Sequence, residues 1–124
     1  MVNKVILVGR AGKDPEIRYT QDNTMIVNLS LATDESYKDK SGEKAQKTEW
    51  HKIVAFGKLA KIIGHYVRKG KLLYFEGRLQ TRSWDDKGVK RYSTEIVASN
   101  MQMLERKEAV TQDEGSRYWL KGEG

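Results

Sequence analysis

Long stretches in which apolar and polar side chains alternate constrain the fold of this chain more than any other feature of its 124 residues. Residues 71–84 alternate in this way, Asp85–Gly88 form a turn signal, and residues 89–103 return as a second β-rich segment. Two long strands joined by a short turn predict a β-hairpin that projects from the body. Trp84 lies near the predicted tip, where a core role is hard to justify, and Lys90 adds positive charge there.

Shorter segments of the same kind precede this hairpin. Apolar runs and alternation predict strands over residues 2–8 (closed by Gly9), 25–33 and 48–56. One convincing helix pattern lies between Gly57 and Gly70, where apolar side chains at i, i+3, i+4 and i+7 form a stripe for core packing, and Gly70 is predicted to cap the helix. Residues 34–47 are polar and almost free of apolar side chains, which predicts a long surface loop.

The predicted order is therefore three strands, one helix and two strands. A mostly β domain in this order matches the OB-fold, a five-stranded Greek-key barrel with its helix between strands three and four. We predict that residues 1–104 form this domain and that residues 105–124 form a short, flexible tail. The fold binds oligonucleotides or oligosaccharides on a strand face flanked by loops, so the side chains must decide between these ligands.

Charge favours the nucleic acid. The chain has a net charge of +6, and residues 1–104 hold 19 Lys and Arg against 12 Asp and Glu. A basic folded region attracts a polyanion.

Composition excludes several classes of site. Without cysteine there is neither a disulfide nor a thiolate metal site, and His51 and His65 show no metal-binding spacing. We therefore expect no metal and no cofactor, and a structural role for each histidine. No apolar run is long enough to span a membrane, and residues 1–4 lead into a strand without a signal segment. A cytoplasmic, nucleoid-associated location is expected.

Two possible enzyme motifs are weak. Gly9–Lys13 is two residues too short for a phosphate-binding P-loop, and Asp14 stands where Ser or Thr would bind magnesium. Asp85 and Asp86 could form the magnesium pair of a nuclease, but adjacent carboxylates before Lys-Gly are more typical of a turn. No catalytic residue is predicted, and we expect that the chain is not an enzyme.

Four aromatic side chains lie near positive charge in the sequence or on a basic strand: Tyr37, Trp50, Phe56 and Trp84. An aromatic ring stacks on any base while a neighbouring cation neutralises the phosphate, which points to single-stranded nucleic acid bound without strong sequence preference. Period two places Trp50, Lys52, Val54 and Phe56 on one face of their strand, and a lysine between two aromatic residues is more typical of a basic stacking platform than of a core. Tyr37 has no apolar neighbours and is predicted to be exposed. The alternative interpretation is that the rings are core and the lysines a solvated rim.

A basic groove along this platform is predicted to follow the phosphates. The candidate phosphate-binding residues are Lys4, Arg10, Lys52, Lys58, Arg78, Arg82 and Lys90.

Several segments resemble the bacterial single-stranded DNA-binding protein family. They are Val2–Gly9, Gly12–Tyr19, Thr48–Lys52, Phe56–Ala60, Tyr74–Gly77 and Tyr92–Val97. The resemblance runs from Val2 to about Leu104. It implies an OB-fold protomer, assembled as a homotetramer, around which single-stranded DNA wraps and is protected during replication, recombination and repair.

The resemblance also assigns roles to residues. It implies that the stacking residues are Tyr37, where a Trp is common, Trp50, Phe56 and Trp84, and that His51 contacts another subunit. An alternative in a different class is a protein-interaction module of the same fold, such as a primosome accessory subunit, which would bind DNA only weakly.

Family members typically continue into a tail rich in glycine, proline and glutamine that ends in an acidic peptide with Pro-Phe. Residues 105–124 have no such tip, so we do not expect recruitment of replication and repair proteins through it. DNA binding is expected to be kept. A tailless family variant, a mitochondrial-type relative and a shortened chain are all open as explanations.

Overall fold

Five strands close into a barrel around one hydrophobic core. The computed structural model describes residues 1–104, and the predicted tail over residues 105–124 lies outside them. Within the described part, no helix has the length and apolar character needed to cross a membrane. In chain order the elements are β1 (Val5–Ala11), β2 (Glu16–Tyr19), β3 (Met25–Lys38), β4 (Lys44–Phe56), α1 (Gly57–Tyr66), β5 (Leu72–Asp86) and β6 (Val89–Met103).

The barrel follows the order β1-β5-β6-β4-β3 and closes where β3 pairs back to β1 at Ala32–Arg10 and Leu31–Ala11. β4 and β6 are parallel, whereas the other pairs are antiparallel. Gly9 lies at the closing point: a Cβ on it would sit 2.2 Å from the carbonyl oxygen of Ala32, so no larger residue fits without a backbone shift. This closed barrel with one helix confirms the predicted OB-fold.

β2 is a strand that the sequence pattern did not predict. Its four residues pair with Met25–Asn28 of β3, along the edge that β1 leaves uncovered, and all four are exposed. A strand of four exposed residues shows no alternation of apolar and polar side chains from which it could be predicted. Because β2 precedes the helix, α1 follows the fourth strand in chain order instead of the predicted third. Among the five barrel strands alone, its position is the one predicted.

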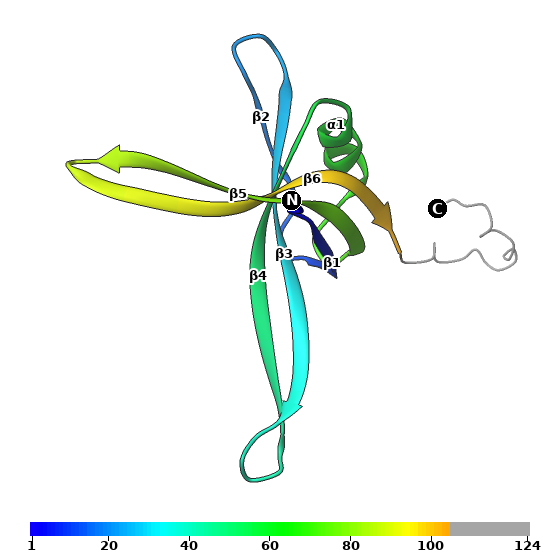
Figure 1. Cartoon of the computed structure of the whole chain (residues 1–124). Coiled ribbons are helices and arrows are strands. Elements are labelled where there is room, and N and C mark those ends of the chain that lie inside the picture. Colours follow the sequence, from blue (N-terminus) through cyan, green and yellow to red (C-terminus); the bar gives the residue numbers. More distant parts are fainter. Residues whose placement is uncertain (105–124) are drawn as a thin grey trace, which may run out of the picture.

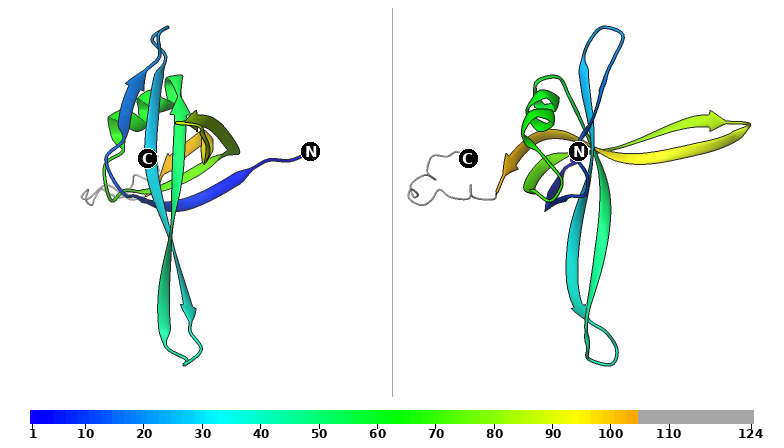
Figure 2. Two further views of the ribbon diagram at one scale, coloured as in Figure 1. Left: turned by 90° about the vertical axis from the view of Figure 1, so that its left-hand side faces the viewer. Right: turned by 180° about the vertical axis from the view of Figure 1, so that it is seen from behind.

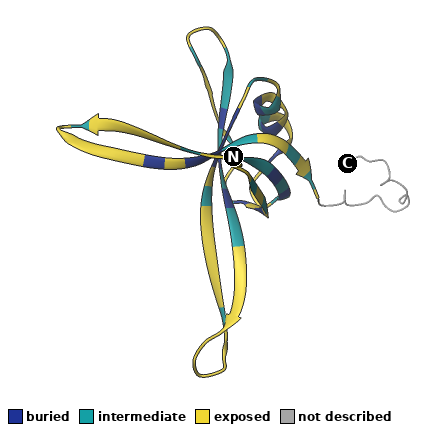
Figure 3. Ribbon diagram, in the orientation of Figure 1, coloured by how far each residue is buried: buried dark blue, intermediate teal, exposed yellow. Residues whose placement is uncertain are grey.

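The core lies where the strands cross, and the projecting ends of the strands are exposed (Figure 3). Buried side chains alternate along β3, as period two requires, whereas Ile53, Val54 and Ala55 of β4 are all buried. The largest fully buried side chains are Phe75, Leu31, Ile53, Ile63, Leu73, Val27 and Val67. Gly64 lets α1 pack closely over Ile17 and Met25, which lie 3.1 Å from where its Cβ would be.

Three β-ribbons project from the barrel in different directions (Figures 1 and 2). The ribbon of β3 and β4 corrects the predicted loop over residues 34–47, because its pairing runs from Ile26–Phe56 to Lys38–Lys44 without a break. Only residues 39–43 connect the strands. Both faces of the ribbon are solvated, so the apolar alternation that marks a half-buried strand is missing although the strand continues.

The long hairpin of β5 and β6 is present as predicted, with a shorter turn. β5 extends to Asp86 and β6 starts at Val89, so only Lys87 and Gly88 connect them. Both have positive φ, 53° and 82°, which identifies a type I′ turn whose twist suits the flanking strands.

The helix is shorter than predicted. α1 ends at Tyr66, and Val67 caps it through its N–H to the carbonyl of Ile63 (2.9 Å). Gly70, with φ of 91°, belongs to the following turn, where its N–H donates to the Ala11 carbonyl (2.8 Å). The predicted cap at Gly70 is therefore wrong. The apolar stripe is also only partly core, because Ile62 is 47% exposed and Tyr66 is 56% exposed.

The first strand begins and ends later than predicted for residues 2–8. The side-chain amide of Asn3 donates to the Leu79 carbonyl (3.0 Å) and accepts from the Leu79 N–H (2.9 Å), so it replaces a backbone pair ahead of Val5. Gly9 does not end the strand. Its missing side chain instead allows β1 to pass close to β3.

Candidate nucleic-acid interface

β4 presents one face to the core and the other outward. Ile53 and Ala55 point inward and are buried, so Trp50, Lys52, Val54 and Phe56 lie on the outer face. Val54, which pairs with Val97 of β6, is also buried at 6% exposure. The residues Trp50 and Phe56 are 61% and 47% exposed. Neither ring belongs to the core, and such exposure of large apolar side chains on a barrel strand is typical of a binding surface.

Gly12 positions Trp50. A Cβ on Gly12 would lie 2.4 Å from Cζ3 and 3.0 Å from Cη2 of Trp50, so the indole rests directly against the glycine backbone. The Gly12 N–H donates to the carbonyl of Ser30 (2.9 Å), which fixes that backbone to β3. Sequence reasoning did not find this contact, because a glycine after a strand signals only a turn.

A groove of about 230 Å³ opens on the same outer face. It brings together two of the predicted phosphate-binding residues, Lys52 and Arg82, with Lys13 from the segment after β1. Asn28 and Ser30 of β3 add polar groups. The other lining residues are Asp14, Glu16, Leu29, Ile53 and Glu95.

Hydrogen bonds order two basic side chains of this groove, Arg82 and Lys52. Arg82 Nε donates to Glu95 Oε2 at 3.0 Å, and the guanidinium carbon lies 5.2 Å from the centroid of the Trp84 ring. Lys52 Nζ donates to Ser93 Oγ at 3.3 Å. The groove is therefore linked to the aromatic side chain of the β5–β6 ribbon.

Trp84 is 42% exposed and lies on the same face as Arg82. Its partner across the ribbon is Arg91, whose Nε donates to Asp86 Oδ2 (3.2 Å). Lys90 pairs with Asp85 and lies on the opposite face. Arg91 thus accompanies Trp84, and Lys90 does not. The sequence could not decide between these neighbours because the register depends on the length of the turn.

Tyr37 is exposed, as predicted, but lies apart from the other three aromatic residues. It pairs with Ala45 near the end of the β3–β4 ribbon, whereas Trp50 pairs with Ala32. By period two, Tyr37 and Trp50 lie on opposite faces of this ribbon.

The other predicted phosphate-binding residues do not line the groove and lie on several elements. Arg78 shares the face of Arg82 and donates to Gln80 Oε1 at 3.1 Å. Lys58 is exposed in the first turn of α1, two residues after Phe56, and Lys4 is exposed just ahead of β1. Arg10 Nη1 donates to the Gly70 carbonyl at 2.9 Å, which ties β1 to the turn after the helix.

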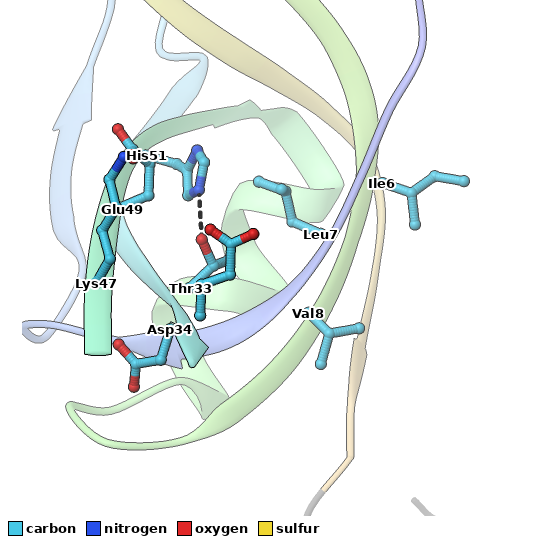
Figure 4. A pocket seen from close by; sticks show the side chains of 9 residues that line it. Ile6, Leu7, Val8, Thr33, Asp34, Lys47, Glu49 and His51 are labelled. Atoms are coloured by element: carbon cyan, nitrogen blue, oxygen red, sulfur yellow. Dashed lines mark hydrogen bonds between the residues drawn. The ribbon is translucent and has the colours of Figure 1, made fainter. Parts of the chain in front are cut away.

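His51 lies on the inner side of β4, away from this surface. Its Nε2 lies 2.9 Å from Thr33 Oγ1, at the edge of a hollow of about 390 Å³ between β1 and the β3–β4 ribbon. Figure 4 shows Leu7 pointing towards the histidine, with Ile6 and Val8 on the other side of β1. The hollow is open to solvent and next to the edge of β1.

Asp85 and Asp86, the possible magnesium pair, are consecutive strand residues whose side chains point to opposite faces. Within residues 1–104, no group of three or more His, Asp or Glu side chains could hold a metal ion.

Comparison with known proteins identifies the family. Residues 2–104 match the model of the single-strand binding protein family. The chain belongs to this family. It is 54% identical over 110 residues to single-stranded DNA-binding protein 1 of Chlorobaculum tepidum, an alignment that covers 87% of this chain and 68% of the relative.

Two solved structures of family members resemble the barrel. One is the Plasmodium falciparum SSB in complex with single-stranded DNA, with a TM-score of 0.78 and 34% identity over 85% of this chain and 96% of the other. The other is a deletion mutant of the single-stranded DNA-binding protein from Thermus aquaticus, with a TM-score of 0.75 and 32% identity over 84% of this chain and 51% of the other.

Proposed function

We propose that this chain coats single-stranded DNA and protects it during replication, recombination and repair. The observation that carries the proposal is the outer face of β4, where exposed Trp50 and Phe56 share a face with Lys52, which lines a groove together with Arg82. Rings stack on bases of any identity, and cations neutralise phosphates. Family membership and the likeness to a structure that contains single-stranded DNA support the same function.

In this proposal residues 1–104 are the DNA-binding domain. Trp50, Phe56 and Trp84 stack on bases along the outer face, and Tyr37 contacts DNA only where the strand passes to the other side of the β3–β4 ribbon. Protection requires binding and no covalent step, so the chain acts without catalysis and without a cofactor. We place it in the cytoplasm, at the nucleoid, where single-stranded DNA arises.

The proposed assembly is a homotetramer. β1 pairs with β5 along Val5–Arg10 but with β3 only at Arg10 and Ala11, so the second edge of residues 5–9 has no strand partner within the described residues. An open strand edge invites pairing with another chain. His51 lines the hollow beside this edge, which suits the subunit contact expected for it.

The first test compares Trp50→Ala with Tyr66→Ala, a matched loss of an exposed ring on α1. Anisotropy of a labelled dT oligonucleotide is measured with each. Trp50→Ala is expected to weaken binding by about 1–3 kcal/mol, the value of one stacked base, while Tyr66→Ala binds as wild type. Unchanged affinity of a folded Trp50→Ala protein would remove Trp50 from the site.

Salt dependence of the wild-type protein tests the groove. The logarithm of the affinity should fall with the logarithm of the salt concentration, by about 0.7 for each phosphate contacted. Equal binding of duplex DNA, or a response that does not depend on salt, would favour a protein-interaction module instead.

A further inference from the structure

Glu95 is an acidic side chain within the proposed DNA groove. It lies on β6, is 8% exposed, and lines the groove with Lys52 and Arg82. Burying a carboxylate costs free energy unless the charge is paired. A negative charge beneath a polyanion also weakens binding. We therefore expect this carboxylate to make an interaction that offsets the cost of its burial and its repulsion of DNA.

That interaction is with Arg82. Its Nε donates to Glu95 Oε2 at 3.0 Å, and its guanidinium carbon lies 5.2 Å from the centroid of the Trp84 ring. The Arg82 side chain is 57% exposed, and a long exposed side chain without an anchor samples many rotamers. In residues 1–104 its only hydrogen-bond partner is Glu95.

We infer that Glu95 is a positioning residue for base stacking. It holds Arg82 over Trp84, so that the guanidinium plane and the indole form one stacking surface, and Arg82 acts in stacking more than in phosphate neutralisation. The inference rests on the proposed DNA binding. The charges of Glu95 and Arg82 largely cancel, so the pair adds little to phosphate neutralisation, whereas a planar guanidinium stacks well. Lys52 differs, because its partner Ser93 is neutral and its charge stays available.

Salt titrations of dT-oligonucleotide affinity separate the two roles. The slope reports phosphate contacts, and the affinity extrapolated to 1 M salt reports the remaining interactions. Glu95→Gln is expected to lower the extrapolated affinity about fivefold, the scale of ordering one long side chain on binding, without reducing the slope. The matched variant Lys52→Gln should do the reverse, with a slope smaller by about 0.7 and little change at 1 M salt.

A double-mutant cycle tests whether Glu95 acts through Arg82. In an Arg82→Gln background, Glu95→Gln should have no further effect on the extrapolated affinity. Arg82→Lys changes an exposed residue, keeps the charge and removes the Nε–H. It should reproduce the loss at 1 M salt even if Glu95→Gln fails to fold.

Three results would overturn the inference. The first is a Glu95→Gln protein with tighter binding at low salt and an unchanged value at 1 M, because Glu95 would then only repel phosphate. The second is additivity in the cycle, and the third is wild-type behaviour of Arg82→Lys. A wild-type protein that does not bind the oligonucleotide would instead refute the proposed function, which is a separate result.

Discussion

At the scale of single residues, Gly12 leaves room for the Trp50 ring because it has no side chain. The three heavy atoms nearest to a Cβ on Gly12 all belong to the Trp50 ring, at 2.4–3.5 Å, and its φ is not in the left-handed region. The backbone therefore accepts alanine, and only the indole has to move. Gly12→Ala is expected to weaken dT-oligonucleotide binding by at most about 1–3 kcal/mol, the value of one stacked base, and to leave the melting temperature nearly unchanged. Anisotropy titrations and circular-dichroism melts measure both.

The control is the same change in a Trp50→Ala background, where no ring remains to be displaced. Gly12→Ala should then leave affinity unchanged. A lower melting temperature with full affinity would contradict the assigned role, since it would mean that the methyl group disturbs the barrel instead of the ring.

Period two alone predicts that Trp50, Lys52 and Phe56 share a face, because this depends only on positions within one strand. The pairing of Trp84 with Arg91 and the hydrogen bond from Arg82 to Glu95 depend on the register between two strands. A two-residue turn sets that register, and a shift by one residue would bring Lys90 to the same face as Trp84. Residue chemistry was therefore readable from the sequence, and cross-strand neighbours were not.

At the scale of elements, the tip of the β3–β4 ribbon is organised by Asp39. Its Oδ1 accepts from the Ser41 hydroxyl (2.8 Å), the Glu43 N–H (2.9 Å) and the Ser41 N–H (3.0 Å). The Ser41 hydroxyl, and after it the Glu43 N–H, lower the pKa of Asp39 below its ordinary value of 3.8. A depressed pKa in the folded state means that the ionised carboxylate stabilises the tip above pH 3.8. This stabilisation is lost as the pH falls through the lower, folded value.

Amide chemical shifts of Ser41 and Glu43, followed by NMR from pH 7 downwards, should therefore show a transition whose midpoint lies below pH 3.8. Asp39→Asn keeps an acceptor oxygen without a titrating group, so its two amides should show no such transition. An Asp39 carboxyl that titrates at or above 3.8 would contradict the assignment.

The same ribbon shows why the element was predicted as a loop. Residues 34–47 contain the polar side chains of a surface loop, and the ladder from Asp34–Thr48 to Lys38–Lys44 is held by backbone pairing that no side-chain pattern reports. The β5–β6 hairpin was predictable because one face of its base is buried, so apolar and polar side chains alternate along it. Strand patterns are readable only where one face meets the core.

At the scale of the whole molecule, the outer side of β1 is the surface through which we propose that protomers combine. Ile6 and Val8 are 55% and 49% exposed there, beside the strand edge that lacks a partner in the described residues. If four protomers assemble, the occluded length on poly(dT) should be about 16–64 nucleotides, since one OB-fold covers about 4–16. Val8→Asp places a charge on this surface and is expected to yield separate protomers. Each protomer should then occlude only the length of one OB-fold, about 4–16 nucleotides. Affinity should fall as well, because linked sites no longer share one strand.

Ile62→Asp is the matched control, because Ile62 is similarly exposed, at 47% against 49% for Val8, but lies on α1. Sedimentation equilibrium gives the mass of each variant, and stoichiometric titration with poly(dT) gives its site size. The control should keep the wild-type mass and site size, whereas Val8→Asp should lower both. If Val8→Asp kept the full mass, β1 would not be the assembly surface, and the open edge would need another explanation. If it dissociated but still occluded the full length, the path of the DNA would lie within one protomer.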